Sequence, residues 1–301
     1  MQTPLPSLAA TEARNSATSE IDRLSPLQIA AVMAAEDAKV AAAVAAEKMA
    51  IGRAIDGITE RMQAGGRLIY QGAGTSGRLG VLDASECPPT FSVPHGLVIG
   101  VIAGGRDALT NAIEGAEDNR AAGAQDLAAL NLTSLDTVVG IATSGRTPYV
   151  LGGIEYARRT GCLTIGIACN EGSILGQMVD IMIAPIVGPE VITGSTRLKA
   201  GTATKLVLNM LSTGTMIRLG KTYGNLMVDL RASNEKLKDR SIRIVAELTG
   251  LDKSSASELL GRCNSEVKTA IVTHKRSVTP DEARSLLAAG KQQLRAALEA
   301  T

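Results

Sequence analysis

Aromatic residues are scarce in this chain of 301 residues, which has no tryptophan, one phenylalanine and four tyrosines. Proteins that hold single-stranded nucleic acid mainly by stacking need several exposed rings. The chain also lacks an excess of positive or negative charge, because 31 Lys and Arg nearly balance 30 Asp and Glu. A balanced chain offers no electrostatic footprint for nucleic acid or anionic lipid. We therefore expect no nucleic-acid partner, and affinity that comes from hydroxyl groups, backbone amides and charges.

Cysteines are few and long apolar runs are missing. Cys87, Cys162, Cys169 and Cys263 show no CxxC spacing and no nearby histidine, so we expect buried free thiols and neither a zinc site nor a disulfide framework. No uncharged apolar run approaches the roughly 18 residues that span a membrane, and the N-terminus lacks the basic start and apolar core of a signal peptide. The sequence predicts a cytoplasmic protein with no metal and no membrane contact.

Strand and helix patterns alternate through the middle of the chain. Buried strands are expected at 68–70, 97–103, 137–142, 163–168 and 181–184, with helices at 78–82, 108–130, 149–160 and 173–178. This alternation predicts an α/β fold, with a doubly wound parallel sheet covered on both faces. Sites in such sheets form at the carboxyl ends of the strands.

Helical patterns flank this central part. An extended arm, residues 1–25, precedes an Ala-rich helical stretch in two pieces, and the C-terminal part is helical throughout. Ser25-Pro26 and Thr279-Pro280 are typical helix starts, because a capping hydroxyl precedes a proline at the first helical position. We therefore divide the chain into an α/β domain with an N-terminal helical arm (1–239) and a small helical domain (240–301).

A glycine-rich loop follows the first predicted strand. Its residues 72–77, GAGTSG, match the GxGxxG pattern of dinucleotide sites. Those sites also need an acidic residue at the end of the second strand, where this chain has Ala103, Gly104 and Gly105. The loop also contains two hydroxyl side chains that a dinucleotide does not require. We therefore expect no nicotinamide cofactor, and indeed no cofactor.

The sequence TSGR occurs twice, each time directly after an apolar strand, at 75–78 and 143–146, and a third hydroxyl-rich segment lies at 194–199. Glycine allows close backbone approach, and helix-start amides, hydroxyls and cations bind anions. One such loop would be explained as a tight turn or a helix cap. Three loops at one sheet edge, without a P-loop lysine, predict a phosphate monoester site. The predicted binding residues are Thr75, Ser76, Gly77, Arg78, Ser144, Gly145, Arg146, Thr147, Ser195, Thr196 and Lys199.

Glutamates close to these loops are candidates for acid and base catalysis. Glu86 precedes Pro88-Pro89, which we expect to end a helix one short turn from the anion site. Glu114 and Glu117 are three residues apart on the helix predicted at 108–130, and so share one face. Each of them alone would also suit a solvent-exposed helix surface. Glu86 paired with one of the other two would supply an acid and a base on one substrate.

Long segments of the chain resemble the N-acetylmuramic acid 6-phosphate etherase family. The most specific are DASECPPTF and GPEVITGSTRLKAGT, and the resemblance covers residues 11–15, 21–28, 72–91, 102–120, 140–153, 187–214 and 223–230, with a weaker likeness in the tail. It implies a doubly wound fold of the sugar isomerase (SIS) type and a homodimer whose active site is shared at the subunit contact. It also implies that the catalytic glutamates are Glu86 and Glu117, which makes Glu114 the less favoured member of its pair.

The implied reaction cleaves the D-lactyl ether of N-acetylmuramic acid 6-phosphate with water, giving N-acetylglucosamine 6-phosphate and D-lactate in the recycling of peptidoglycan sugars. Ring opening exposes a C1 aldehyde that acidifies the C2 proton, so a base at C2 and an acid at the C3 oxygen suffice. We expect Glu86 to be the acid and Glu117 the base, although the residues leave this division open. Alternatives are a non-catalytic phosphosugar sensor, as glucokinase regulatory protein is, and an aldose–ketose isomerase.

Overall fold

The computed structural model describes residues 10–229 and 235–299. The chain divides into two compact units. The first contains the chain up to Ser85 and residues Gly96–Ser212, and the second contains Glu86–His95 and the chain from Thr213 onward. Each unit has its own buried apolar core. Among the described residues, no helix is both long enough and apolar enough to cross a membrane.

A sheet of five parallel strands forms the centre of the first unit. The strands are β1 (Leu68–Gly72), β2 (Val98–Ile102), β3 (Thr137–Ile141), β4 (Leu163–Ile167) and β5 (Ile181–Ile183), arranged in the order β2-β1-β3-β4-β5. All five predicted strands are confirmed. Leu68 pairs with both Val98 and Thr137, so the strand order reverses at β1 and β3. In doubly wound sheets, this reversal opens a crevice at the carboxyl ends of the strands.

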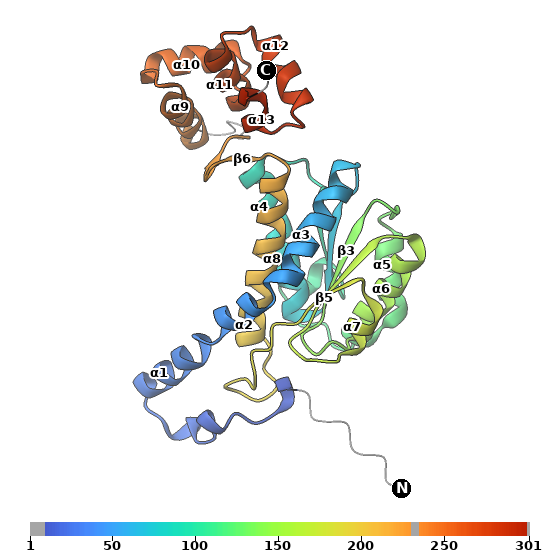
Figure 1. Ribbon diagram of the computed structural model, residues 1–301. Coiled ribbons are helices and arrows are strands. Elements are labelled where there is room, and N and C mark those ends of the chain that lie inside the picture. The colour runs from blue at the N-terminus through green and yellow to red at the C-terminus, as the bar shows by residue number, and fades with distance from the viewer. Residues whose placement is uncertain (1–9, 230–234, 300–301) are drawn as a thin grey trace. The chain divides into compact units, whose positions relative to one another are not determined.

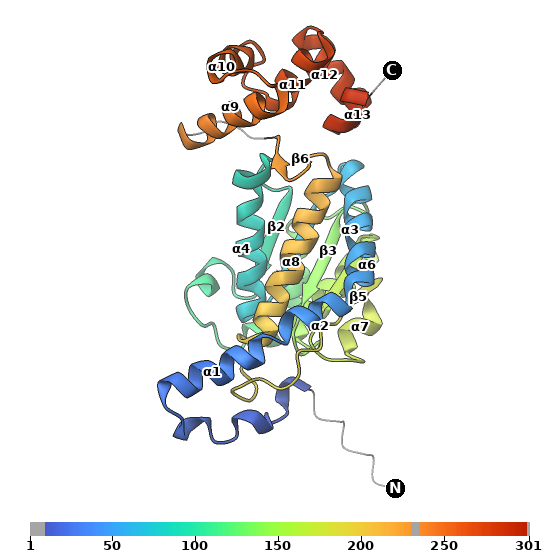
Figure 2. The same ribbon diagram turned by 60° about the vertical axis from the view of Figure 1, so that its left-hand side comes forward.

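Helices cover both faces of the sheet, as Figures 1 and 2 show. One face carries α3 (Lys48–Gln63), α4 (Gly74–Phe91) and α8 (Lys199–Arg218), and the other carries α5 (Arg120–Ala128), α6 (Pro148–Thr160) and α7 (Ile174–Met178). Asp83 on α4 accepts hydrogen bonds from Asn209 and Ser212 on α8, which holds these two helices side by side. The doubly wound architecture predicted from the alternating pattern is therefore confirmed.

The N-terminal part of the first unit consists of short helices. The arm contains the 3-10 helices η1 (Ala10–Glu12), η2 (Ser16–Thr18) and η3 (Ile21–Arg23), and then α1 (Pro26–Asp37), α2 (Val40–Ala46) and α3 follow. The Ala-rich stretch thus forms three helices where two were predicted. The predicted start at Ser25 is confirmed, because its hydroxyl and the Gln28 side chain form a capping box.

Two local predictions near the glutamates were wrong. The single helix expected at 108–130 is replaced by η4 (Arg106–Leu109), a loop, η5 (Ala116–Asp118) and α5, because Gly115 adopts a left-handed conformation with φ of 71°. Glu114 and Glu117 therefore do not share a helix face. The other helix, α4, also does not end at the two prolines at 88 and 89 but continues through them to Phe91.

Among its described residues, the second unit contains helices and one short hairpin, made of β6 (Thr222–Tyr223) and β7 (Leu226–Met227). Its helices are α9 (Glu235–Thr249), α10 (Lys253–Arg262), α11 (Val267–Arg276), α12 (Pro280–Ala289) and α13 (Leu294–Glu299). The predicted helix start at Thr279 is confirmed by a capping box with Glu282. The helical pattern expected throughout this part is interrupted between α12 and α13, where Lys291 and Gln292 have positive φ angles. All four cysteines are buried, as predicted, and none of them forms a disulfide.

Candidate functional site

A polar cleft of about 560 Å³ opens where β1 and β3 end, at the reversal of strand order. It lies in the first unit and is built from the loops after these strands together with parts of the N-terminal arm and the loop before α8. The residues that line it are Glu12, Ala73, Gly74, Thr75, Ser76, Glu117, Asp118, Ile141, Ala142, Thr143, Ser144, Arg146, Thr147, Pro148, Gly194 and Thr196. Its position is the one that the sheet topology predicts for a ligand site.

Helix N-termini face this cleft. Gly74 begins α4 and lines the cleft, and Pro148 does the same for α6. The N-cap residue of α6, Thr147, makes no side-chain capping hydrogen bond, whereas Ser173 caps α7 with its hydroxyl. The first amides of a helix have no intrahelical partner, and they carry a partial positive charge. An uncapped helix start at a cleft is therefore suited to receive an anion.

Hydroxyl groups supply most of the remaining donors in the cleft. They belong to Thr75, Ser76, Thr143, Ser144, Thr147 and Thr196. The lining contains one cation, Arg146, and three carboxylates, Glu12, Glu117 and Asp118. Opposing charge alone therefore cannot hold a phosphate here, and hydrogen bonds from hydroxyls and amides must carry the affinity. The carboxylates give the same cleft groups that can accept or donate a proton.

The structure gathers only part of the predicted site in the cleft. Of the predicted residues, Thr75, Ser76, Ser144, Arg146, Thr147, Thr196 and Glu117 line it, whereas Gly77, Arg78, Gly145, Ser195, Lys199 and Glu86 do not. Gly77 and Gly145 instead shape the loops. A Cβ atom on Gly77 would lie 2.7 Å from the Gly72 carbonyl oxygen, and one on Gly145 would lie 2.3 Å from Ser173 Cβ.

Glu86 lies farther from the loop than predicted. It is an exposed residue ten positions after Ser76 on the continuous helix α4, and this separation corresponds to about 15 Å of helix rise. The prediction of one short turn was wrong, because it assumed that the prolines ended the helix near its start. Lys199 is buried in an ion pair with Glu36, and the structure does not bring its ammonium to the cleft.

Sequence reasoning missed Glu12, which lines the cleft from η1. Its neighbour Thr11 is fully buried, and the Thr11 amide donates to Asn170 Oδ1 while the Gly194 amide donates to the Thr11 carbonyl. These contacts attach the N-terminal arm to the loop after β4 and to the loop before α8. The only signal in the sequence was the segment TEARN, which resembles the family but carries no periodicity or motif of its own.

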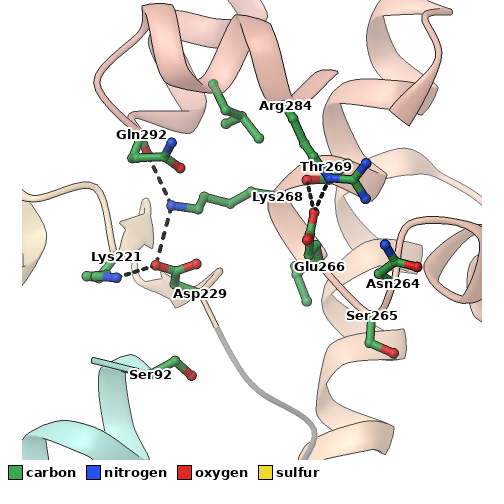
Figure 3. Close-up of a pocket in the computed structure, with 12 residues that line it drawn as sticks. Ser92, Lys221, Asp229, Asn264, Ser265, Glu266, Lys268, Thr269, Arg284 and Gln292 are labelled. Atoms are coloured by element: carbon green, nitrogen blue, oxygen red, sulfur yellow. Dashed lines mark hydrogen bonds and ion pairs between the residues drawn. The ribbon is translucent and has the colours of Figure 1, made fainter. Parts of the chain in front are cut away.

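A larger cavity of about 700 Å³ lies within the second unit (Figure 3). Its charged side chains are paired with one another: Asp229 contacts Lys221 at 2.5 Å and Lys268 at 3.4 Å, and Glu266 contacts Arg284 at 2.9 Å. Burial lowers the pKa of the Lys268 ammonium, against the opposing effect of Asp229. Because each of these charged groups already has an ion-pair partner, we assign the candidate site to the cleft in the first unit.

Comparison with protein-family models identifies SIS domains in this chain. The model for the glucokinase regulatory protein N-terminal SIS domain matches residues 50–158, the general SIS domain matches 117–214, and the C-terminal lid domain of glucokinase regulatory protein matches 224–268. A phosphoheptose isomerase structure from Francisella tularensis aligns with a TM-score of 0.50 at 20% identity, over 66% of this chain and 99% of that chain. At this identity, the likeness supports the fold alone.

Curated proteins give much stronger similarity. The chain is 60% identical over 277 residues to an N-acetylmuramic acid 6-phosphate etherase from Rhodopirellula baltica, which covers 92% of each chain. It is 56% identical over 288 residues to a protein of the same name from Pectobacterium atrosepticum, over 96% of this chain and 95% of that protein. Both alignments extend through both compact units.

Proposed function

Because this chain belongs to the N-acetylmuramic acid 6-phosphate etherase family, we propose that it cleaves the D-lactyl ether of N-acetylmuramic acid 6-phosphate. Water is the second substrate, and the products are N-acetylglucosamine 6-phosphate and D-lactate. The observation that carries this proposal is the cleft at the ends of β1 and β3, in which hydroxyls and helix-start amides accompany Glu117. Such a cleft offers donors for a phosphate and a carboxylate for proton transfer at the sugar.

The proposed reaction is an elimination followed by an addition. The open-chain aldehyde form of the sugar has an acidic C2 proton, which the Glu117 carboxylate removes. The electron pair forms the C2–C3 double bond, the C3–O bond breaks, and the lactate oxygen leaves with a proton from a general acid. Water then adds at C3 and a proton returns to C2, which restores the charge of both groups. The phosphate, far from C2 and C3, supplies binding energy that orients the reacting atoms.

We assign the general acid to Glu86 and propose that the protein acts as a homodimer, as the family resemblance implies. In that arrangement Glu86 of one copy serves the cleft of the other. Mixing the inactive variants Glu86→Gln and Glu117→Gln, with exchange of subunits, would then restore about a quarter of wild-type activity, because half of the dimers are mixed and each has one intact site. No recovery after demonstrated exchange would contradict the shared site.

The reaction itself is tested with the wild-type protein and the sugar phosphate in ¹⁸O-labelled water. Release of D-lactate together with label in the 3-hydroxyl of the product supports cleavage of the C3–O bond. Unlabelled sugar would show that a different bond breaks. Binding without turnover would favour the alternative of a phosphosugar sensor, which the matches to models of glucokinase regulatory protein bring into consideration.

The proposal extends to the cellular role that the resemblance implies, which is recycling of peptidoglycan sugars in the cytoplasm. This role is tested by comparing the kcat/KM values of the protein for different sugar phosphates, because a recycling enzyme should prefer the muramic acid derivative. Phosphorylated sugars without the lactyl ether should bind as products or inhibitors, and they should not turn over. Interconversion of an aldose phosphate and a ketose phosphate would instead support the isomerase alternative.

A further inference from the structure

A second pocket, of about 360 Å³, adjoins the cleft within the first unit. It lies between the start of α4 and the segment that connects β2 to η5. The two cavities share Ala73, Gly74 and Glu117. Glu117 therefore belongs to the wall between them, so that a ligand reacting at Glu117 can place one part in each cavity.

The lining of this pocket is mainly small and apolar. Methyl and methylene groups come from Ala73, Ala103, Ala108, Ala112, Ile113 and Ala116, and the polar side chains are Arg78, Asn111, Glu114 and Glu117. Arg78 is the pocket's single cation. The cavity thus combines an apolar wall with one guanidinium, and it contains none of the hydroxyl groups that line the neighbouring cleft.

Two neutral carbonyl groups hold the guanidinium of Arg78. Its Nε donates to the Leu109 carbonyl at 3.1 Å, and its Nη2 donates to the Asn111 carbonyl at 2.9 Å. Within the residues that the structure describes, no carboxylate forms an ion pair with Arg78. A guanidinium has five N–H donors and two of them are used here, so Arg78 keeps three donors and an uncompensated charge for a ligand.

The arginines of the two TSGR segments therefore lie in different cavities despite the identical sequence. Arg146 lines the hydroxyl-rich cleft, whereas Arg78, at the equivalent position, lines the apolar pocket. A phosphate ester held in the cleft would have only the first of these cations beside it. The second cation then requires a different anionic group on the ligand, on the far side of Glu117.

We propose that this pocket binds the lactyl group of the substrate and that Arg78 pairs with the lactyl carboxylate. This inference rests on the proposed function, in which Glu117 acts at C2. The lactyl ether is attached to the neighbouring carbon, C3, and it carries a methyl group and a carboxylate, which match the apolar wall and the guanidinium. The acetamido group on C2 is neutral and would leave the charge of Arg78 unpaired.

Arg78 is thereby a specificity-determining residue for binding. The lactyl carboxylate keeps its charge throughout the reaction, so its pairing stabilises substrate and transition state equally and affects KM more than kcat. Glu114 lines the same pocket and repels an anion there. Glu114→Gln should therefore bind the substrate slightly more tightly, whereas loss of Arg78 should weaken binding.

The test is a double-mutant cycle in which Arg78 is changed in the protein and the lactyl carboxylate is changed in the ligand. Binding is measured in a Glu117→Gln background, with the muramic sugar phosphate, its lactamide analogue and N-acetylglucosamine 6-phosphate. We expect the protein with Arg78 to prefer the acid over the amide by about 10- to 100-fold, the range for a charge-assisted hydrogen bond. Arg78→Met should lose that preference and bind N-acetylglucosamine 6-phosphate unchanged.

Arg146→Met is the matched control, because its substitution should weaken all three ligands alike. A preference for the acid that survives in Arg78→Met would overturn the inference, as would equal weakening of the lactyl-free sugar. Either result would leave the proposed function intact as long as the wild-type protein releases lactate. If the wild-type protein releases no lactate, the proposed function itself is refuted. If Arg78→Met does not fold, Arg78→Gln, which can still donate to a carbonyl, gives the same comparison.

Discussion

Lys199 Nζ lies 2.6 Å from Glu36 Oε2, in an ion pair whose side chains are 1% and 5% exposed. The pair joins the start of α8 to the end of α1. From the other side, Glu190 accepts hydrogen bonds from the amides of Lys199 and Ala200. Buried charge therefore fixes the helix start that follows the hydroxyl-rich segment, and Lys199 acts by positioning this segment.

Loss of the Lys199 ammonium should destabilise the protein strongly. Lys199→Met leaves the Glu36 carboxylate buried without its buried partner, and breaking a buried pair in this way costs about 3–5 kcal/mol. Lys39→Met is the control, because Lys39 also contacts Glu36 but is 61% exposed, and such a pair is worth about 1 kcal/mol or less. Urea unfolding measures both variants, and equal losses would contradict the assigned role of burial.

Acid should remove the contribution of this pair. The hydrogen bond from Lys199, with that from Lys39, lowers the pKa of Glu36 from 4.5 to about 2. A carboxyl whose folded-state pKa is lowered stabilises the fold fully above its unfolded pKa, and this stabilisation is lost as the pH falls toward the folded value. Glu36→Gln should therefore have a shallower loss of Tm between about pH 5 and pH 2 than the wild type. Parallel curves would argue against the pair.

Substitution of Glu117 should block catalysis and spare binding. Glu117→Gln should lower lactate release by roughly 10²- to 10⁴-fold, the range for general acid–base catalysis. It should also stop exchange of the C2 proton of N-acetylglucosamine 6-phosphate in deuterated water, followed by NMR, whereas Glu86→Gln should retain that exchange. Glu114→Gln removes a neighbouring carboxylate that has no proposed role in proton transfer, and we expect it to retain the wild-type kcat with a slightly lower KM. Retained exchange in Glu117→Gln would assign the base elsewhere.

The hydroxyl of Thr147 should contribute to phosphate binding. Its side chain caps no amide of α6 and lines the cleft, so Thr147→Val removes a donor without removing a helix cap. We expect about 10-fold weaker binding of substrate and product alike, measured by calorimetry. Ser173→Ala is the control, since the Ser173 hydroxyl does cap α7. Its loss should cost about 1 kcal/mol of stability and leave ligand binding unchanged. The reverse pattern would contradict the assignment.

An alanine at Gly145 should damage the second TSGR loop. Gly145 has a φ of 68°, and a Cβ atom would lie 2.3 Å from Ser173 Cβ, so Gly145→Ala combines backbone strain with a steric overlap. We expect a lower Tm and weaker binding of N-acetylglucosamine 6-phosphate. Gly52→Ala in α3, where nothing lies within 4 Å, should instead raise Tm slightly. A neutral Gly145→Ala would show that the loop can rearrange.

Local sequence determined much of this fold because short-range interactions decide strands and helix starts. An apolar run or a capping residue such as Ser25 or Thr279 acts on neighbours within a few positions. The five strands and these two helix starts could therefore be predicted directly from the sequence. Local reasoning failed where a single residue's backbone conformation mattered, as at Gly115, whose positive φ interrupts the predicted helix. It also failed at Pro88-Pro89, where α4 continues.

The sequence by itself determined the doubly wound sheet, the hydroxyl-rich loops at the ends of its strands and the likeness to a sugar phosphate enzyme. Only the tertiary structure decided which side chains share a cavity. Arg78 and Arg146 occupy equivalent positions in identical motifs, yet they line different cavities, and Lys199 contacts a carboxylate 163 positions away in the chain. The physical reason is that a motif fixes the backbone of its own turn, whereas the direction and partner of a long side chain depend on segments that the fold brings beside it.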